Sequence, residues 1–330
     1  MILNLFYQEP DPDRWLPLDR YPRRAIRRIV RGKRLPGGQM MVFINLVKGL
    51  DKLGVPYRVN DFRYARGHPE ELACIVGKPH VLFERRWENP VLFGASIFSH
   101  PLACPDLLER YPVKRVLVPG EWMRDMCEPY YGDAVKAWPV GVDTDFWAPS
   151  GQDKDIDCLV YDKILWHEET RREQLLNPLV RHLQKLRLNI AVVRRGFYKP
   201  EDYQSLLGRS KCMVFLCEHE TQGLAYQEAL ASGIPVFAWD REGVWEDPDY
   251  YPDRVEYSPV SSVPYWSDAC GMKFRDLEEG IEKWGRFWER VNSLGESDKF
   301  EPRDFILSNL TLEKAASAYL SHVHDVVDSF

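Results

Sequence analysis

Two glutamates, Glu220 and Glu228, have seven residues between them and flank a glycine at the expected start of a helix. The apolar run 213–217 precedes them and is typical of a buried parallel strand. We expect the helix over 223–233, because a glycine ends the pattern and a proline follows it. Residues 234–239 are then expected to form the next strand. The pattern therefore predicts a strand–turn–helix–strand unit with a carboxylate on each side of the helix start.

This arrangement suits a ligand that contains phosphate. A helix N-terminus offers free N–H groups and partial positive charge, so the backbone of Gly223 and Leu224 is predicted to bind phosphate. Glu228, about one turn into the helix, is predicted to accept hydrogen bonds from two neighbouring hydroxyls such as those of a ribose. Glu220, at the strand end, is predicted to face the group beyond the phosphates. A nucleotide sugar has these parts in this order.

The stretch resembles the E-x7-E signature of retaining GT-B glycosyltransferases, family four in particular. In that family a glycine follows the first glutamate by three residues, the second glutamate follows by eight, and A-x-A-x-G-x-P-V completes the pattern. The corresponding residues here are Glu220, Gly223, Glu228, Ala229, Ala231, Gly233, Pro235 and Val236. One departure is that the family often has Gly-Phe where this chain has Thr221 and Gln222.

The resemblance implies an α/β fold of the GT-B type, in which two Rossmann-like parallel-sheet domains face a cleft. The alternation of expected strands and helices in both halves also favours two parallel-sheet domains. We expect an acceptor-side domain over 1–149, a nucleotide-sugar domain over 150–310, and a last helix over 311–330 that packs back on the first domain. Residues 136–149 resemble the family's inter-domain passage, N-G-V-D-x-x-x-F-x-P, with Val140 where asparagine is usual.

Hydrophobic periodicity predicts the remaining elements. Strands are expected over 2–7, 55–60, 81–83, 91–98, 113–118, 156–161 and 188–193. Helices are expected over 39–53, 171–187, 203–207, 277–293 and 311–327, with a further helix around 122–126.

Lys163 and Arg171 are predicted to neutralise the leaving diphosphate, since fixed cations aimed at developing negative charge lower a barrier. The resemblance implies an arginine and a lysine early in the second domain, in a pattern like G-R-x-x-x-x-K-G. Here the two charges are exchanged and the spacing is longer, and Arg172 is the alternative to Arg171. The competing interpretation is a surface helix start with solvated charges.

Two first-domain positions complete the predicted site. Gly37 and Gly38 open an expected helix, where backbone N–H groups can approach a phosphate without an intervening Cβ. His100 follows an expected strand, at the end of a parallel sheet where ligands bind. The resemblance implies a Gly-rich loop at the first position and a histidine near the donor sugar at the second. The alternatives are an ordinary turn and a packed or exposed histidine.

Composition excludes several other classes. The 330 residues are 45% hydrophobic and 28% charged, as in globular proteins, and the net charge of −6 argues against nucleic acid as a partner. No apolar run approaches the roughly 18 residues of a membrane span, and the N-terminus lacks the features of a signal peptide. Seven scattered cysteines without a C-x-x-C pair indicate reduced thiols, no zinc site and a cytoplasmic protein.

The D-x-D tripeptides at 143–145, 155–157 and 247–249 resemble the metal site of GT-A glycosyltransferases. Such tripeptides arise easily in a chain with 50 acidic residues, and the first falls in the inter-domain passage. We therefore expect no metal.

Residues 20–34 form an expected basic amphipathic helix, with Ile26, Ile29 and Val30 on one face and arginines elsewhere. It is either a solvated face or a contact with an anionic surface, such as the inner leaflet of a membrane or a charged acceptor.

The predicted function is transfer of a sugar from a nucleotide sugar to a glycan or glycolipid acceptor, with retention and without metal. Three alternatives stay open: a GT-B sugar-nucleotide epimerase, a metal-dependent GT-A transferase, and an inactive GT-B sugar-binding module.

Overall fold

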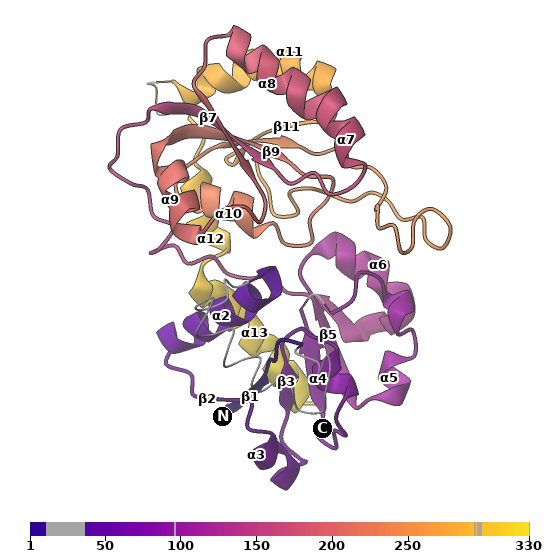
Figure 1. The fold of residues 1–330 in the computed structure, drawn as a ribbon. Coiled ribbons are helices and arrows are strands. Elements are labelled where there is room, and N and C mark those ends of the chain that lie inside the picture. The colour runs from indigo at the N-terminus through magenta and orange to yellow at the C-terminus, as the bar shows by residue number, and fades with distance from the viewer. Residues whose placement is uncertain (11–36, 96, 294, 296–298, 330) are drawn as a thin grey trace, which may run out of the picture.

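The computed structural model describes residues 1–10, 37–95, 97–293, 295 and 299–329. The chain forms two α/β domains, each built on one parallel sheet (Figure 1), so the predicted fold class is confirmed. The basic helix predicted over 20–34 lies outside the described residues. Among the described helices, none is both long and apolar enough to cross a membrane.

The first domain contains a six-stranded sheet of order β2-β1-β3-β4-β5-β6, in which all neighbours are parallel. Its strands are β1 (Leu3–Phe6), β2 (Tyr57–Val59), β3 (Ala73–Ile75), β4 (Val91–Gly94), β5 (Val113–Val118) and β6 (Val135–Ala137). One face is covered by α2 (Gly38–Lys52) and α13 (Leu312–Val327). The other is covered by α3 (Phe62–Gly67), α4 (His80–Phe83), α5 (Leu107–Arg110) and α6 (Glu121–Tyr131).

The second domain contains a five-stranded parallel sheet of order β11-β10-β9-β7-β8. Its strands are β7 (Ile156–Asp162), β8 (Ile190–Arg194), β9 (Ser210–Leu216), β10 (Val236–Trp239) and β11 (Gly271–Phe274). One face packs against α9 (Pro200–Arg209), α10 (Leu224–Ala231) and α12 (Pro302–Asn309), and the other against α8 (Asn177–Lys185) and α11 (Leu277–Val291). The central strand β9 is buried on both faces, as its apolar sequence requires.

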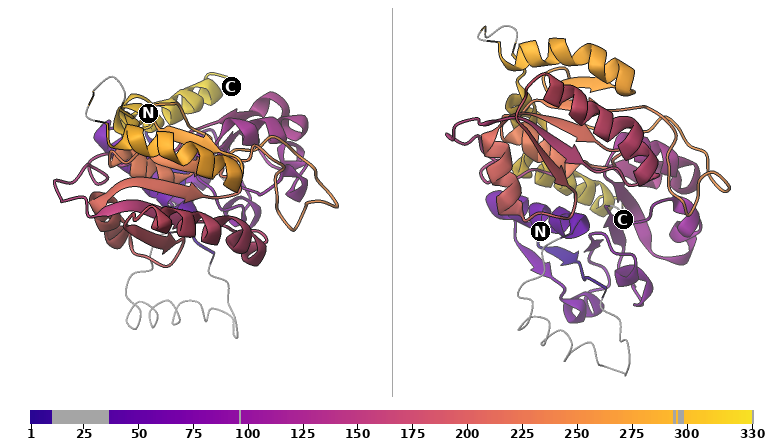
Figure 2. Two further views of the ribbon diagram at one scale, coloured as in Figure 1. Left: turned by 90° about the horizontal axis from the view of Figure 1, so that it is seen from above. Right: turned by 45° about the horizontal axis from the view of Figure 1, so that its top comes forward.

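The last helix returns to the first domain. After α12 the chain crosses back, and α13 lies beside α2 (Figures 1 and 2). The two helices approach closely at Gly49, where a Cβ would collide with the Leu312 backbone. The passage that leads from β6 to the second domain lies next to this returning chain, because Val142 forms a parallel bridge with Thr311. Two crossings of the chain are therefore adjacent.

Three sequence predictions need correction. Residues 81–83, predicted as a strand, form the single helical turn α4, in which Val81 and Leu82 are buried while Phe83 is exposed. The helix predicted over 171–187 is divided into α7 (Glu168–Arg171), a π-helical turn η3 (Arg172–Leu176) and α8. The strand predicted over 91–98 ends at Gly94. Short apolar runs do not distinguish one helical turn from a strand, because neither periodicity completes a repeat.

Candidate functional site

The predicted strand–turn–helix–strand unit is confirmed as β9, α10 and β10. Gly223 is the N-cap of α10 with φ of +80°, in the left-handed region. A Cβ at this position would also collide with the Tyr226 ring, so only glycine fits. Among the described residues no side chain caps this end of α10. The first N–H groups of the helix are therefore left to a ligand or to water.

Glu220 is buried in the turn before α10. Its carboxylate forms an ion pair with the Lys163 ammonium, and its Oε1 lies 3.8 Å from the Cys217 thiol. Its backbone N–H donates to Ser261 O at 2.9 Å, and its carbonyl accepts from Trp122 Nε1 at 2.8 Å. The turn holds this carboxylate in a fixed place.

Lys163 directly follows β7, and its backbone N–H donates to Leu216 O at the end of β9. The carboxyl ends of the two central strands therefore bring Lys163 to Glu220, as parallel pairing predicts. Burial lowers the pKa of Lys163 to about 8, and the charge of Arg195 acts in the same direction. The ammonium is costly to hold without an anion, because desolvation disfavours the charged form.

Glu228 lies on α10, partly buried, about one turn after the helix start. Among the described residues no group forms a hydrogen bond or ion pair with its carboxylate. Burial raises the pKa of Glu228 to about 8, and the charge of Lys163 opposes this effect. Shielding a carboxylate from water without a hydrogen-bond partner costs free energy, and a ligand with hydroxyl donors would reduce that cost.

Arg195 is a residue that sequence reasoning missed. It follows β8, its backbone N–H donates to Asp162 O at 3.0 Å, and its exposed side chain has no ion pair among the described residues. Its charge acts on both Lys163 and Tyr198. The sequence feature that could have identified Arg195 is its place just after the strand expected over 188–193, since the neighbouring strands end at predicted site residues.

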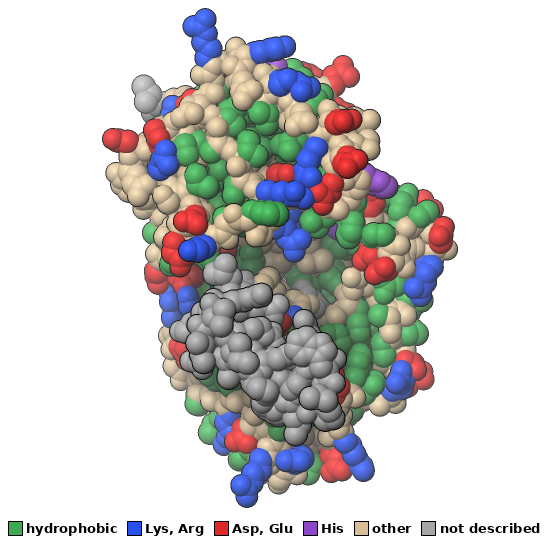
Figure 3. Space-filling model, viewed as in Figure 1, with side chains coloured by type: hydrophobic (Ala, Val, Ile, Leu, Met, Phe, Trp, Pro, Cys, Tyr) green, Lys and Arg blue, Asp and Glu red, His purple; other side chains and the backbone are tan. Residues whose placement is uncertain are grey.

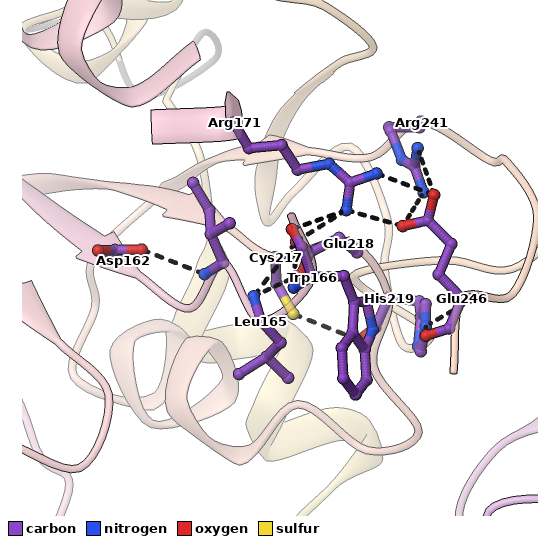
Figure 4. Close-up of polar contacts among 10 residues, drawn as sticks. Asp162, Leu165, Trp166, Arg171, Cys217, Glu218, His219, Arg241 and Glu246 are labelled. Atoms are coloured by element: carbon purple, nitrogen blue, oxygen red, sulfur yellow. Dashed lines mark hydrogen bonds and ion pairs between the residues drawn. The ribbon is translucent and has the colours of Figure 1, made fainter. Parts of the chain in front are cut away.

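Arg171 and Arg172 both have acidic partners. The Arg171 guanidinium bonds Glu218 Oε1 at 2.9 Å and the Glu246 carboxylate at 2.7 and 2.8 Å (Figure 4). Arg172 pairs with Asp162 at 3.0 Å and with Glu168 at 2.6 Å. A phosphate would reach Arg171 only by replacing one of its carboxylate partners.

His100 is buried between the domains. Its Nδ1 accepts from the Leu102 N–H at 3.1 Å, and its ring centroid lies 5.4–5.5 Å from those of Tyr130, Trp245 and Tyr250. Burial lowers the pKa of His100 to about 4, and the charge of Arg254 acts in the same direction. The imidazole is therefore neutral near pH 7, and its described contacts are with aromatic rings rather than with Glu220.

Gly38 is the first residue of α2, after the N-cap Gly37. A Cβ at either glycine would meet no atom of the described residues within 4 Å. The structure places no described side chain over this helix end as a cap. On the face shown in Figure 3 the surface is hollowed between the domains, with charged side chains of both signs on the second-domain rim. Among the described residues, no three His, Cys, Asp or Glu side chains form a group that could hold a metal ion.

Part of the second domain is similar to a known protein family. Residues 151–246, which include Lys163, Arg195, Glu220 and Glu228, match the family described as "Glycosyl transferases group 1". The two parallel-sheet domains match solved glycosyltransferase structures along the whole chain. The fold is GT-B. No curated protein sequence matches this chain significantly.

Three solved structures resemble this GT-B chain. AviGT4, a glycosyltransferase involved in avilamycin A biosynthesis, aligns with a TM-score of 0.59 at 12% identity, covering 99% of this chain and 98% of its own. Sucrose-phosphate synthase from Thermosynechococcus elongatus aligns with 0.61 at 11% identity, covering 99% of each chain. HepE from Anabaena, solved with UDP, aligns with 0.59 at 11% identity, covering 98% and 100%. These likenesses establish the fold.

Proposed function

We propose that this GT-B protein is a retaining glycosyltransferase of the family four type, which transfers a sugar, such as a hexose, from a nucleotide sugar without a metal ion. The observation that carries the proposal is the Glu228 carboxylate on α10. It has no partner among the described residues, and it lies close to Lys163 and to a helix start that no described side chain caps. These features lie within the range that matches the glycosyl transferases group 1 family.

Each donor part has a proposed partner. Glu228 accepts hydrogen bonds from the ribose diol, and Glu220 orients the donor sugar. The α10 backbone at Gly223 and Leu224, together with Lys163 and Arg195, binds the diphosphate. The site lowers the barrier by positioning the reactants and by stabilising the charge that develops on the leaving diphosphate. The donor phosphate then steers the acceptor to the same face of the sugar, which retains configuration.

The other predicted residues have subsidiary roles in the proposal. Arg171 binds the diphosphate when a phosphate oxygen replaces the Glu246 carboxylate. Gly38 presents the start of α2 from the first domain, and His100 approaches the donor sugar as an uncharged ring. The acceptor is a glycan or glycolipid, and the process served is polysaccharide or glycolipid biosynthesis.

A ligand screen followed by a transfer assay tests the function. UDP, GDP and ADP and their sugar conjugates are screened for a rise in melting temperature, since a ligand at 100 times its Kd stabilises by about 2.7 kcal/mol. UDP is the first probe, because HepE was solved with it. The best donor is then incubated with glycan and lipid-linked acceptors, with and without excess chelator, and the anomeric configuration is read by NMR. Absence of nucleotide binding refutes the proposal, and a donor-only reaction indicates an epimerase. Loss of activity in chelator that manganese restores refutes metal independence.

We also propose that segment 20–34 binds an anionic membrane surface, which would place the protein in the cytoplasm at the inner leaflet. Its positive charge motivates this, at about 1 kcal/mol per basic residue near such a surface. Replacing Arg23, Arg24, Arg27 and Arg28 by Gln should abolish sedimentation with anionic vesicles while turnover of a soluble acceptor persists. If the unmutated protein does not sediment with anionic vesicles at low salt, the membrane proposal is wrong.

A further inference from the structure

The turn from Glu220 to Leu224 contacts the first domain at several of its residues. Trp122 on α6 donates its indole N–H to the Glu220 carbonyl at 2.8 Å. Gly120 lies so close that a Cβ there would be 2.8 Å from Thr221 O. Leu224 packs against the first-domain core formed with α2 and α13. The second domain thus supplies the turn, and the first domain supports it.

Gln222, in the middle of this turn, binds both polar backbone groups of one first-domain residue. Its Oε1 accepts from the Val140 N–H at 2.9 Å, and its Nε2 donates to the Val140 carbonyl at 3.1 Å. The second Nε2 proton goes to Gln227 Oε1 at 2.9 Å, and Gln227 Nε2 returns a bond to the Gln222 carbonyl at 2.7 Å. Both side chains are buried, so each lost bond would leave an unpaired polar group.

Val140 lies where the two crossings of the chain meet. It follows β6 and Trp138, in the passage that leads to the second domain, and Val142 bonds the returning chain at Leu310 O at 2.8 Å. Trp138 Nε1 in turn donates to Ala315 O on α13 at 2.9 Å. A group fixed to Val140 is therefore fixed to the first domain and to both crossings.

We propose that Gln222 is a positioning residue that sets the donor-binding turn against the first domain. The inference rests on the proposed function, because only a transfer between two substrates requires the donor-binding turn to keep a fixed position relative to the first domain. Two departures from the family pattern meet here, since Gln222 stands where phenylalanine is frequent and Val140 where asparagine is usual. In this chain the Gln222 side-chain amide, from the second domain, forms hydrogen bonds with the backbone N–H and carbonyl of Val140 in the inter-domain passage.

The expected consequence is selective. Most proposed contacts with the nucleoside diphosphate, those of Glu228, Lys163 and α10, lie within the second domain, so most of the nucleotide affinity does not depend on the Gln222 bonds. Transfer does require them, because a misplacement of about 1 Å between reacting groups can cost roughly a hundredfold in rate. A residue with a purely structural role would instead lower stability without separating these two quantities.

The test uses Gln222→Met, which keeps the length of the side chain but removes all three hydrogen bonds, and Gln222→Glu, which retains acceptance from the Val140 N–H. The matched control is Asn45→Leu. Asn45 on α2 is buried and donates to Gly141 O at 2.7 Å, next to Val140, but belongs to the first domain. The Asn45→Leu variant therefore removes a buried amide that donates to the same passage, but it leaves the hydrogen bonds between the domains intact.

One readout needs no substrate. Spin labels are placed at Glu128→Cys on α6 and Lys185→Cys on α8, and the distance distribution between them is measured. Labelling is selective because the seven native cysteines are free and buried. We expect Gln222→Met to broaden or shift the distribution and Asn45→Leu to leave it unchanged. An unchanged distribution in folded Gln222→Met overturns the proposal.

The second readout is kinetic. Gln222→Met is expected to lower kcat for transfer at least tenfold while Kd for UDP, GDP or ADP, whichever the unmutated protein binds, stays within twofold. Gln222→Glu should also lower kcat, because a carboxylate oxygen cannot donate to the Val140 carbonyl or to Gln227 Oε1. Asn45→Leu should retain both kcat and Kd. Equal kcat in Gln222→Met and the unmutated protein overturns the inference alone. If the unmutated protein binds none of the three nucleotides, the proposed function fails, while the distance measurement still tests whether Gln222 positions the turn against the first domain.

Discussion

Replacing Glu228 by Gln should make the protein more stable at pH 8 while leaving its stability near pH 5 almost unchanged. The unfolded chain releases the Glu228 proton near the ordinary value of 4.5, whereas burial raises the pKa in the folded protein to about 8. Between these values folding takes up a proton, so the stability of the unmutated protein falls as pH rises through this window. Glutamine does not titrate, so the stability of the variant does not fall in this way as pH rises.

The magnitude follows from the two values. They differ by about 3.5, and each pKa unit corresponds to about 1.36 kcal/mol, which gives an upper bound of about 5 kcal/mol. The carboxylate is partly exposed, and water that reaches it reduces the penalty. We expect a gain of about 2 kcal/mol at pH 8 relative to pH 5. For a domain of this size that corresponds to roughly 4–8 °C in melting temperature.

Calorimetry of both proteins from pH 5 to 9 measures the difference. The control is Glu279→Gln, because a hydrogen bond from Lys283 lowers the pKa of Glu279. Its charged form stabilises the fold and is fully present above about pH 5, so that variant should be less stable than the unmutated protein by a constant amount from pH 5 to 9. If Glu228→Gln and the unmutated protein show parallel pH profiles, the Glu228 carboxylate is solvated, and the argument for an unpartnered ligand group at this position is refuted.

Further variants separate the proposed roles within the site. Above pH 8, where Glu228 is charged in the folded protein, Glu228→Ala should weaken nucleoside diphosphate binding ten- to a hundredfold by calorimetric titration, since a charge-assisted hydrogen bond is worth about 1.5–3 kcal/mol; unchanged affinity removes it from the site. Glu220→Gln should lower turnover with diphosphate affinity nearly kept, and retained turnover contradicts its assigned role. Arg195→Met should lower diphosphate affinity about tenfold, whereas Arg194→Met, which removes a partner of Glu168, should not; equal effects would disprove a direct contact. Gly223→Ala should lower the melting temperature and abolish nucleotide binding, because its φ is +80° and a Cβ meets the Tyr226 ring; a variant with normal binding would show that the turn tolerates a side chain.

The sequence by itself determined the fold class and the central unit of the site. Residues 212–216 of β9 are a continuous apolar run, and the glycines before and after α10 mark where the helix begins and ends. These signals are local, because a buried parallel strand and a glycine-bounded helix each depend on consecutive residues. The spacing of Glu220 and Glu228 follows from the same unit, so their places were predictable without tertiary contacts.

Only the tertiary structure decided which charged groups are available. Arg171 looked like a diphosphate ligand from its position, but Glu218 and Glu246 enclose its guanidinium, and the second of these lies 75 residues away. Arg195 joins the site because β8 pairs with β7, an order of strands that no local pattern specifies. Likewise, Gln222 and Val140 meet across 82 residues. Side-chain availability depends on which distant segments pack together, and local periodicity carries no information about that.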